Sequence, residues 1–258
     1  MPVAKVTNPN SKGNSGFIWA VGVLLVIAAV VIGYIVISGK DAKSDKIAEN
    51  AVDVTMETSV DDNGVVTLKS AKTKESTPEV DLYEDFSCPH CAELAEGSDK
   101  PMKEAVENGE LVVNIHTLNF LDLRGVDLEK FMSDESIKLE GHSSKAASVM
   151  DIIARSGDAK TYWNMRAYLL ENQQSVGSWD FDDFAEAAKG FGADDDVTKK
   201  VKNTNVDAGN ENGRANAKKL KDTTGSVSSP RVLKNGKDID PPKGTPVSQW
   251  NFVEQVVK

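Results

Sequence analysis

The sequence predicts an α/β domain with an inserted helical region, preceded by a single transmembrane helix. Three observations predict it. Two strand-like segments flank a helical segment, a long helical interval separates them from a final strand, and residues 17–38 contain no charged side chain. With 258 residues, of which 40% are hydrophobic, the chain is long enough for one or two domains with buried cores.

Residues 17–38 read FIWAVGVLLVIAAVVIGYIVIS and predict a transmembrane signal anchor. A helix of this length extends about 33 Å, enough to cross a hydrocarbon core of about 30 Å. A cleaved signal peptide is the alternative, but its apolar region is usually only about 7–15 residues long. The lysines on the two sides of the run are almost balanced in number, so charge alone does not decide the orientation.

Residues 39–64 predict a polar stalk between this anchor and the folded domain, which should span residues 65–258. The stretch is rich in Lys, Asp, Ser, Asn and Thr, and its few apolar residues follow no sustained helical or strand period. An additional strand around Val52–Met56 is the alternative interpretation.

The domain begins with strands over residues 65–70 and 78–86, and a third strand is predicted over 111–118. A helix over residues 91–108 connects the second strand to the third, which implies that these two strands are parallel. Pro101 lies within this helix and should break or kink it, because proline lacks the backbone donor and clashes with the preceding turn.

A helical insertion follows at about residues 133–222. Its first segment places Ala147, Met150 and Ile153 on one face, as in an amphipathic helix. Helices are predicted over residues 138–156, 159–171, 180–191 and 207–222. The remaining predicted elements are a strand over 228–235, a hairpin turn at Asn235-Gly236, a short segment over 238–240 and a last helix over 247–258.

The composition excludes several classes of protein. The chain carries 40 acidic and 30 basic side chains, and this acidic excess argues against nucleic acid as a partner. Its 2 cysteines are too few for a small disulfide-stapled protein. Together with only 3 histidines, they can scarcely supply the ligand pairs of a Cys₄ or Cys₂His₂ zinc module.

The two cysteines stand together in the motif Ser87-Cys88-Pro89-His90-Cys91, at the predicted junction of a strand and a helix. Cys88 should lie beside the unpaired N–H groups of the first helical turn, and these donors favour its thiolate. Pro89 fits the first turn because its missing N–H would have no helical partner. His90 adds a donor and, when protonated, a positive charge. The donors of the first helical turn and His90 both stabilise the thiolate of the reduced form, which makes a disulfide between these cysteines more oxidising.

Two other interpretations of this pair carry less weight. Metal sites also use C-x-x-C motifs, but they need further ligands, and the chain has no other cysteine. A purely structural disulfide would close a very short loop and would constrain the unfolded chain little. We therefore predict a redox-active dithiol, with neither a metal nor a cofactor.

Three stretches resemble a known family: YEDFSCPHC, the helical interval after it, and TGSVSSPRVLKNGK toward the end of the chain. They are similar to the DsbA-like thiol-disulfide oxidoreductases, in the membrane-anchored form found in bacteria without a conventional periplasm. The resemblance covers about residues 65–258. It implies a thioredoxin fold, built from about residues 65–121 and 223–258, into which the helical domain at about 133–222 is inserted.

The resemblance also implies a role for each site residue. Cys88 is expected to be the nucleophile and Cys91 the resolving thiol, with Pro89-His90 between them tuning the reduction potential. Pro230 is expected to follow a cis peptide bond and, together with Ser229, to present the loop that binds the substrate chain.

One position departs from the family pattern. Relatives often carry a buried acid six residues before the first cysteine, and Leu82 occupies that position here. Glu84 and Asp85 are near, but strand alternation directs their side chains to opposite faces, so neither is assigned a role in proton transfer.

The activity implied by the resemblance is the introduction of disulfide bonds into reduced or unfolded exported proteins. A quinone-linked membrane oxidase is the implied partner that reoxidises the dithiol. An oxidising role requires the domain to lie outside the cytosol, which would orient residues 1–16 toward the cytoplasm in a single-pass protein of the cell membrane. A membrane-tethered reductase or isomerase, or a noncatalytic binding domain, are the alternatives.

Other conspicuous residues have structural interpretations. The aromatic cluster of Tyr162, Trp163 and Tyr168 is predicted to form the core of the insertion and not a substrate groove. Asp194–Asp196 predict the start of a helix, since negative charge is favoured there. Phe86 and Phe120 either flank the dithiol or pack in the core.

Overall fold

The computed structural model describes residues 47–49 and 51–257. The predicted transmembrane segment and the first part of the predicted stalk lie outside these residues. Within the described part of the chain, no helix is both long enough and apolar enough to cross a membrane.

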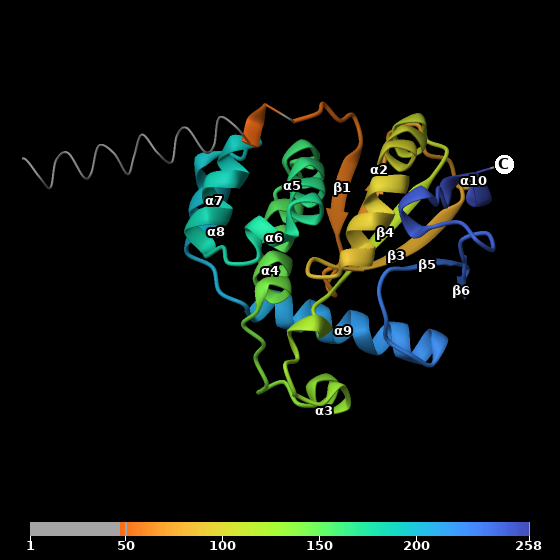
Figure 1. The fold of residues 1–258 in the computed structure, drawn as a ribbon. Helices are drawn as coiled ribbons and strands as arrows, with labels where there is room; N and C mark the ends of the chain where they lie inside the picture. The colour runs from red at the N-terminus through yellow and green to blue at the C-terminus, as the bar shows by residue number, and fades with distance from the viewer. Residues whose placement is uncertain (1–46, 50, 258) are drawn as a thin grey trace, which may run out of the picture. The chain divides into compact units, whose positions relative to one another are not determined.

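A sheet of six strands, in the order β1-β2-β4-β3-β5-β6, forms the centre of the domain (Figure 1). Strands β3 and β4 are parallel, and the other neighbouring pairs are antiparallel. The strands are β1 (Glu57–Val60), β2 (Val66–Lys69), β3 (Glu79–Asp85), β4 (Val112–Leu118), β5 (Arg231–Lys234) and β6 (Lys237–Asp238).

Helix α2 (Pro89–Asn108) connects β3 to β4, so the predicted strand–helix–strand unit with parallel strands is confirmed. The helix continues through Pro101, and the predicted break does not occur. Leu94 and Met102 are buried on the two sides of the proline, and this packing compensates for the missing backbone hydrogen bond.

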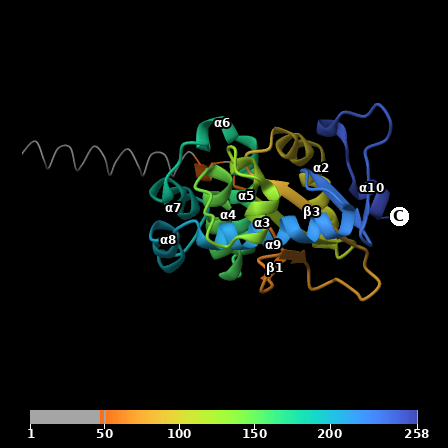
Figure 2. The ribbon, with the colours of Figure 1, turned by 90° about the horizontal axis from the view of Figure 1, so that it is seen from below.

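The insertion between β4 and β5 is helical, as predicted. Figures 1 and 2 show α4, α5, α7 and α8 gathered beside the sheet, with α9 running from them toward β5. The four predicted helices are present; of three shorter ones, only the start of α8 was predicted, and α3 and α6 were not. The helices are α3 (Leu128–Ser133), α4 (His142–Arg155), α5 (Ala159–Glu171), α6 (Gln173–Val176), α7 (Phe181–Gly190), α8 (Asp195–Lys202) and α9 (Asp207–Thr224), with a 3-10 turn η1 (Phe120–Asp122) before them.

The insertion contains the predicted helix start at Asp194 and the aromatic cluster. Asp194 accepts a hydrogen bond from the Val197 N–H and caps α8, so the predicted helix start is confirmed. Tyr162 and Trp163 are buried in the main hydrophobic core, as predicted. Tyr168 is only partly buried, stacks on Trp179 and lines a hollow between α2 and α5.

The predicted stalk is wrong over residues 57–60, which form β1 and pair with β2 at the edge of the sheet. Ile47 and Met56, before this strand, are buried as well. Val52, Val54, Met56 and Val60 recur with a period of two, so one side of this stretch can face the domain. The strand lies later than the alternative at 52–56.

The end of the chain differs from its prediction. The hairpin between β5 and β6 turns at Asn235 and Gly236, both with positive φ, as predicted. The single helix predicted over 247–258 is wrong, because a 3-10 turn η2 (Val247–Gln249) and a short α10 (Val253–Val256) take its place. Between them Trp250 is extended, and its carbonyl accepts a 2.6 Å hydrogen bond from the Ser98 hydroxyl on α2.

Candidate active site

The turn from β3 into α2 positions both cysteines. Cys88 is the N-cap residue of α2 with an extended backbone, and Pro89 is the first residue of the helix. The Cys88 N–H donates to the Asp85 carbonyl at 2.9 Å, and the Cys91 N–H donates to the Cys88 carbonyl at 3.0 Å. Cys88 therefore stands at the helix amino terminus, and Cys91 lies one turn further along.

The two sulfur atoms face different surroundings. The Cys88 Sγ lies 3.5 Å from the Ser229 carbonyl oxygen, while the Cys91 Sγ accepts a hydrogen bond of 3.4 Å from the Asp85 N–H. Both cysteines are free thiols in the structure and both are buried, with 6% of Cys88 and 2% of Cys91 exposed. Cys88 is thus the sulfur nearer the loop that precedes β5.

The thiols also differ in acidity. A hydrogen bond from the Cys91 thiol, assisted by the side chain of Ser229, lowers the pKa of Cys88 to about 5 despite its burial. The backbone N–H groups of Cys91 and His90 lower it further. Burial raises the pKa of Cys91 well above its ordinary value, and its contacts with Cys88 raise it more. The site therefore favours a thiolate at Cys88 beside a neutral thiol at Cys91.

His90 is an exposed residue between the cysteines. Its Nδ1 lies 2.9 Å from the Glu93 carboxylate, and this hydrogen bond and the negative charge of Glu93 raise the pKa of His90. The negative charge of Cys88 raises it as well. His90 therefore stabilises the Cys88 thiolate both through its backbone N–H group and through the charge of its protonated ring.

The loop before β5 completes the site. The Ser229-Pro230 peptide bond is cis, and Pro230 borders a hollow of about 230 Å³ that His90 and Trp250 also line. The structure thus brings together the residues that the sequence singles out, namely Cys88, Pro89, His90, Cys91, Ser229 and Pro230.

Leu82, at the position where the resemblance implies a buried acid, is a core residue, and Glu84 is one of two buried acids near the dithiol. Two nitrogens of Arg166 contact the Glu84 carboxylate, the shortest at 2.6 Å, and a third donates to both oxygens of Asp99 at 2.9 Å. The negative charge of Glu84 also raises the pKa of Cys91.

Asp85 is a second buried acid that the sequence did not assign. Its carboxylate accepts hydrogen bonds from the Ser87 N–H at 2.9 Å, the Leu121 N–H at 3.2 Å and the Ser143 hydroxyl. Burial raises the pKa of Asp85 to about 7, although these donors oppose the shift. Asp85 thereby joins the dithiol turn to η1, which follows β4, and to α4 of the insertion.

The insertion reaches Cys88 itself through Gln173 at the start of α6. The Gln173 Nε2 donates a 2.9 Å hydrogen bond to the Cys88 carbonyl. No sequence pattern pointed to this contact, because its partners are 85 residues apart. Phe86 is fully buried in the core, which supports packing as its role.

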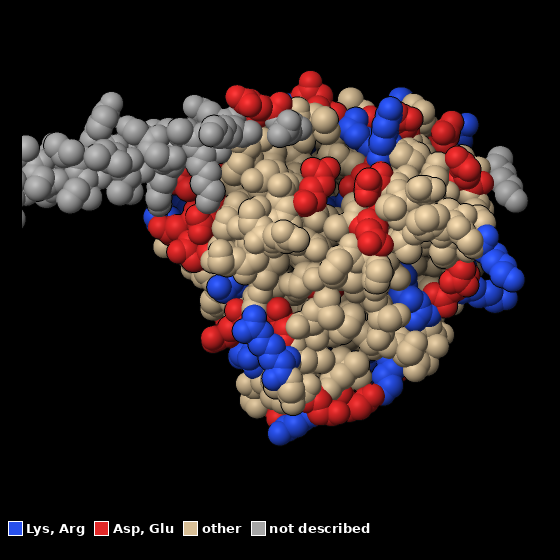
Figure 3. Space-filling model, viewed as in Figure 1, with Lys and Arg blue, Asp and Glu red and all other residues tan. Residues whose placement is uncertain are grey.

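The surface near the dithiol carries little charge. In Figure 3, the area over the amino-terminal end of α2 is largely free of acidic and basic side chains. In the described part of the chain, no group of three or more His, Cys, Asp or Glu side chains is placed to hold a metal ion.

Comparisons with known proteins agree on the fold. The family model described as thioredoxin matches residues 73–249. The solved MdbA protein of Corynebacterium diphtheriae, a thiol-disulfide oxidoreductase, is 40% identical, with a TM-score of 0.69 over 82% of this chain and 98% of that one. MdbA of Corynebacterium matruchotii is 35% identical, with a TM-score of 0.70 over 84% and 99% of the two chains.

A more distant structure shares only the fold. MdbA of Actinomyces oris is 17% identical, with a TM-score of 0.50 over 70% of this chain and 80% of that one. No curated protein matches the sequence. Together, the family model, the two corynebacterial structures and the geometry of the dithiol show that the chain belongs to the thioredoxin family, as a DsbA-like thiol-disulfide oxidoreductase.

Proposed function

We propose that this oxidoreductase introduces disulfide bonds into exported proteins through the Cys88-Pro89-His90-Cys91 site. The observation that carries the proposal is the difference between the two thiols: the pKa of Cys88 is lowered to about 5, and that of Cys91 is raised. A stabilised thiolate favours the reduced enzyme, so its disulfide readily takes electrons from a substrate. A reductase needs the opposite preference.

The first step forms a mixed disulfide. A substrate thiolate attacks the Cys88 sulfur of the oxidised enzyme, and the bond between Cys88 and Cys91 breaks. Cys91 leaves with the electron pair and takes up a proton, as expected from its raised pKa. The acidity of Cys88 and its position beside the Ser229-Pro230 loop support it as the attacked sulfur.

The second step releases the product. The other thiolate of the substrate attacks the substrate sulfur of the mixed disulfide, and Cys88 leaves as a thiolate. Its low pKa makes Cys88 a good leaving group. Two electrons have then passed from the substrate to the enzyme. One substrate proton resides on Cys91 and the other has gone to the solvent.

The proposal includes a location and a partner. Residues 17–38 anchor the chain in the cell membrane, with residues 1–16 in the cytoplasm and the catalytic domain outside. The uncharged character of residues 17–38 supports the anchor, and the need for an oxidising compartment supports the orientation. A quinone-linked membrane oxidase then takes the electrons from the reduced dithiol.

A paired assay on the full-length protein tests the activity. The oxidised enzyme should restore activity to a reduced, unfolded protein that needs its disulfides, and it should reduce insulin slowly. Cys88→Ser should abolish the oxidation. Cys91→Ala, given the substrate in its oxidised form, should accumulate a mixed disulfide, because the Cys88 thiolate attacks the substrate disulfide and releases one substrate thiolate. Rapid insulin reduction without substrate oxidation would support a reductase instead.

The noncatalytic alternative needs a cellular test. The Cys88→Ala/Cys91→Ala double variant should fail to restore disulfide formation in cells that lack the protein, while the wild-type chain restores it. Full restoration by the double variant would show that the function does not require thiol chemistry.

A further inference from the structure

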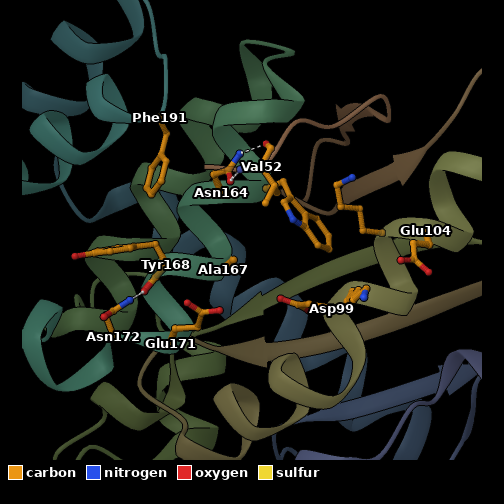
Figure 4. Close-up of a pocket in the computed structure, with 12 residues that line it drawn as sticks. Val52, Asp99, Glu104, Asn164, Ala167, Tyr168, Glu171, Asn172 and Phe191 are labelled. Atoms are coloured by element: carbon orange, nitrogen blue, oxygen red, sulfur yellow. Dashed lines mark hydrogen bonds between the residues drawn. The ribbon is translucent and has the colours of Figure 1, made fainter. Parts of the chain in front are cut away.

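A hollow of about 580 Å³ lies between α2 and α5, and we call it the α2–α5 pocket. Its aromatic walls are Trp163, Tyr168 and Phe191. Val52 lines it as well, and its backbone is held in place by Asn164, whose side chain accepts from the Val52 N–H at 2.7 Å and donates to the Val52 carbonyl at 2.9 Å. These two hydrogen bonds fix the position of the Val52 backbone at the pocket (Figure 4).

Negative charge collects at this pocket. Figure 4 shows Asp99 on α2 and Glu171 on α5, on facing sides of the hollow. Arg166 is a single cation bound between two carboxylates, at 2.6 Å from Glu84 and 2.9 Å from Asp99. One guanidinium cannot neutralise both carboxylates. The group therefore keeps a negative charge next to the pocket when both acids are ionised.

Glu171 adds to this charge without a cationic partner of its own among the described residues. Glu171 is exposed, but partial desolvation of its carboxylate and the negative charge of Asp99 raise the pKa of Glu171, so Asp99 disfavours its ionisation. A cation between them would remove this repulsion.

Two lysines, Lys100 and Lys103, also line the pocket. Lys103 forms an ion pair of 2.8 Å with Glu107, so the Glu107 carboxylate already balances the charge of Lys103. Lys100 is exposed, and the acidic Glu104 lies on the same helix and lines the same hollow. Figure 3 shows acidic side chains over α2 and α5 on this face, with basic side chains beside them.

The pocket is continuous with the surface beside the dithiol. A second hollow, of about 410 Å³, is lined by Pro89 and Ala92 at the start of α2 and by the beginning of α6. Glu171 and Asn172 line both hollows. A polypeptide bound to Cys88 can therefore extend along α2 and place a neighbouring side chain in the α2–α5 pocket.

We infer that the α2–α5 pocket binds a lysine or arginine side chain of the substrate polypeptide while a substrate cysteine reacts at Cys88. The inference rests on the proposed oxidase function and deepens it by assigning a preference for basic residues near the reactive cysteine. The carboxylates pair with the cationic end, and the aromatic walls contact the aliphatic stem and the charge.

Paired peptides test this preference on the full-length oxidised protein. Each pair consists of two dithiol peptides that differ at one position, which is arginine in one and citrulline in the other. Across the series of pairs, this position lies at increasing distances from the first cysteine. Citrulline keeps the shape and removes the charge. At the best spacing, the KM for the arginine peptide should be lower by about threefold to tenfold.

Two variants with the same change of charge distinguish an effect of the pocket from an effect of the protein's overall electrostatic field. Glu171→Gln should bring the KM ratio close to one, while Glu75→Gln, in the exposed turn between β2 and β3, should preserve it. Equal KM values for the two peptides at every spacing, or a ratio that Glu171→Gln leaves unchanged, would overturn the inference.

Binding of a cysteine-free arginine peptide makes the test independent of turnover. The wild-type protein should bind it more tightly than the citrulline version in calorimetry, and Glu171→Gln should remove the difference. If peptide oxidation fails while this binding preference is present, the proposed oxidase function is wrong and the pocket assignment holds. Equal binding of the two peptides by the wild-type protein would refute the assignment.

Discussion

Cys88 owes its acidity to donors from two separate parts of the chain. The largest contribution comes from the Cys91 thiol within α2, and Ser229 contributes from the loop before β5. Burial opposes this effect but does not cancel it. The nucleophile is therefore sensitive both to the helix turn and to the position of the loop.

The thiolate can be titrated directly. In the reduced protein, the ultraviolet absorbance of the Cys88 thiolate should appear with a midpoint at a pH of about 5. Cys91→Ala should raise that midpoint, because it removes the strongest donor. A midpoint at a pH of about 8.5, the pKa of an ordinary cysteine, would contradict this description of the site.

The same shift makes the stability of the reduced protein depend on pH. The folded pKa of Cys88 lies below its unfolded value of about 8.5, so its thiolate stabilises the fold fully above that pH. This contribution is lost as the pH falls through about 5. Urea unfolding should therefore show the reduced form losing stability relative to the oxidised form on acidification. A stability difference between the reduced and oxidised forms that does not change with pH would contradict the lowered pKa of Cys88.

Asp85 should show the opposite dependence. Its folded pKa of about 7 lies above the unfolded value of about 3.9, so the stability it contributes is fully present below about 3.9 and is lost as the pH rises through about 7. In thermal unfolding, the wild-type protein should lose stability over this range relative to Asp85→Asn. Parallel pH profiles for the two proteins would mean that Asp85 does not titrate in the folded state.

Elements with a strong local pattern were predictable from the sequence. Helix α5 has the predicted bounds Ala159–Glu171, and β3 and β4 lie within one or two residues of their predictions. Strand β1 was missed because Val60 is its only apolar residue, which is too few to show an alternation within the strand. The last helix failed because burial of Trp250 and its contact with Ser98 favour an extended residue there.

The ion pairs of Arg166 connect three elements, since Glu84 lies on β3, Asp99 on α2 and Arg166 on α5. Arg166→Ala would leave the buried Glu84 carboxylate and the partly buried Asp99 carboxylate without a cation, and we expect a loss of about 3–5 kcal/mol in urea unfolding. Lys200→Ala, which breaks the exposed pair with Asp196, should have no measurable effect and serves as the control. Similar stabilities for the two variants would contradict the role assigned to Arg166.

At the scale of the whole molecule, the insertion and the thioredoxin scaffold meet at the dithiol. Ser143 on α4 donates to Asp85, and Gln173 at the start of α6 donates to the Cys88 carbonyl. The sequence predicted the dithiol and the proline loop because short motifs carry them. It could not predict these contacts, because each joins polar residues far apart in the chain without a local pattern.

The central claim is that the fold stabilises the reduced dithiol and so makes its disulfide an oxidant. Equilibrium with glutathione redox buffers measures the reduction potential of the Cys88–Cys91 pair in the full-length protein. We predict a value less negative than about −180 mV, the potential of protein disulfide isomerase, and closer to the value of about −120 mV for DsbA. A more negative potential, in the direction of the value of about −270 mV for thioredoxin, would contradict the claim.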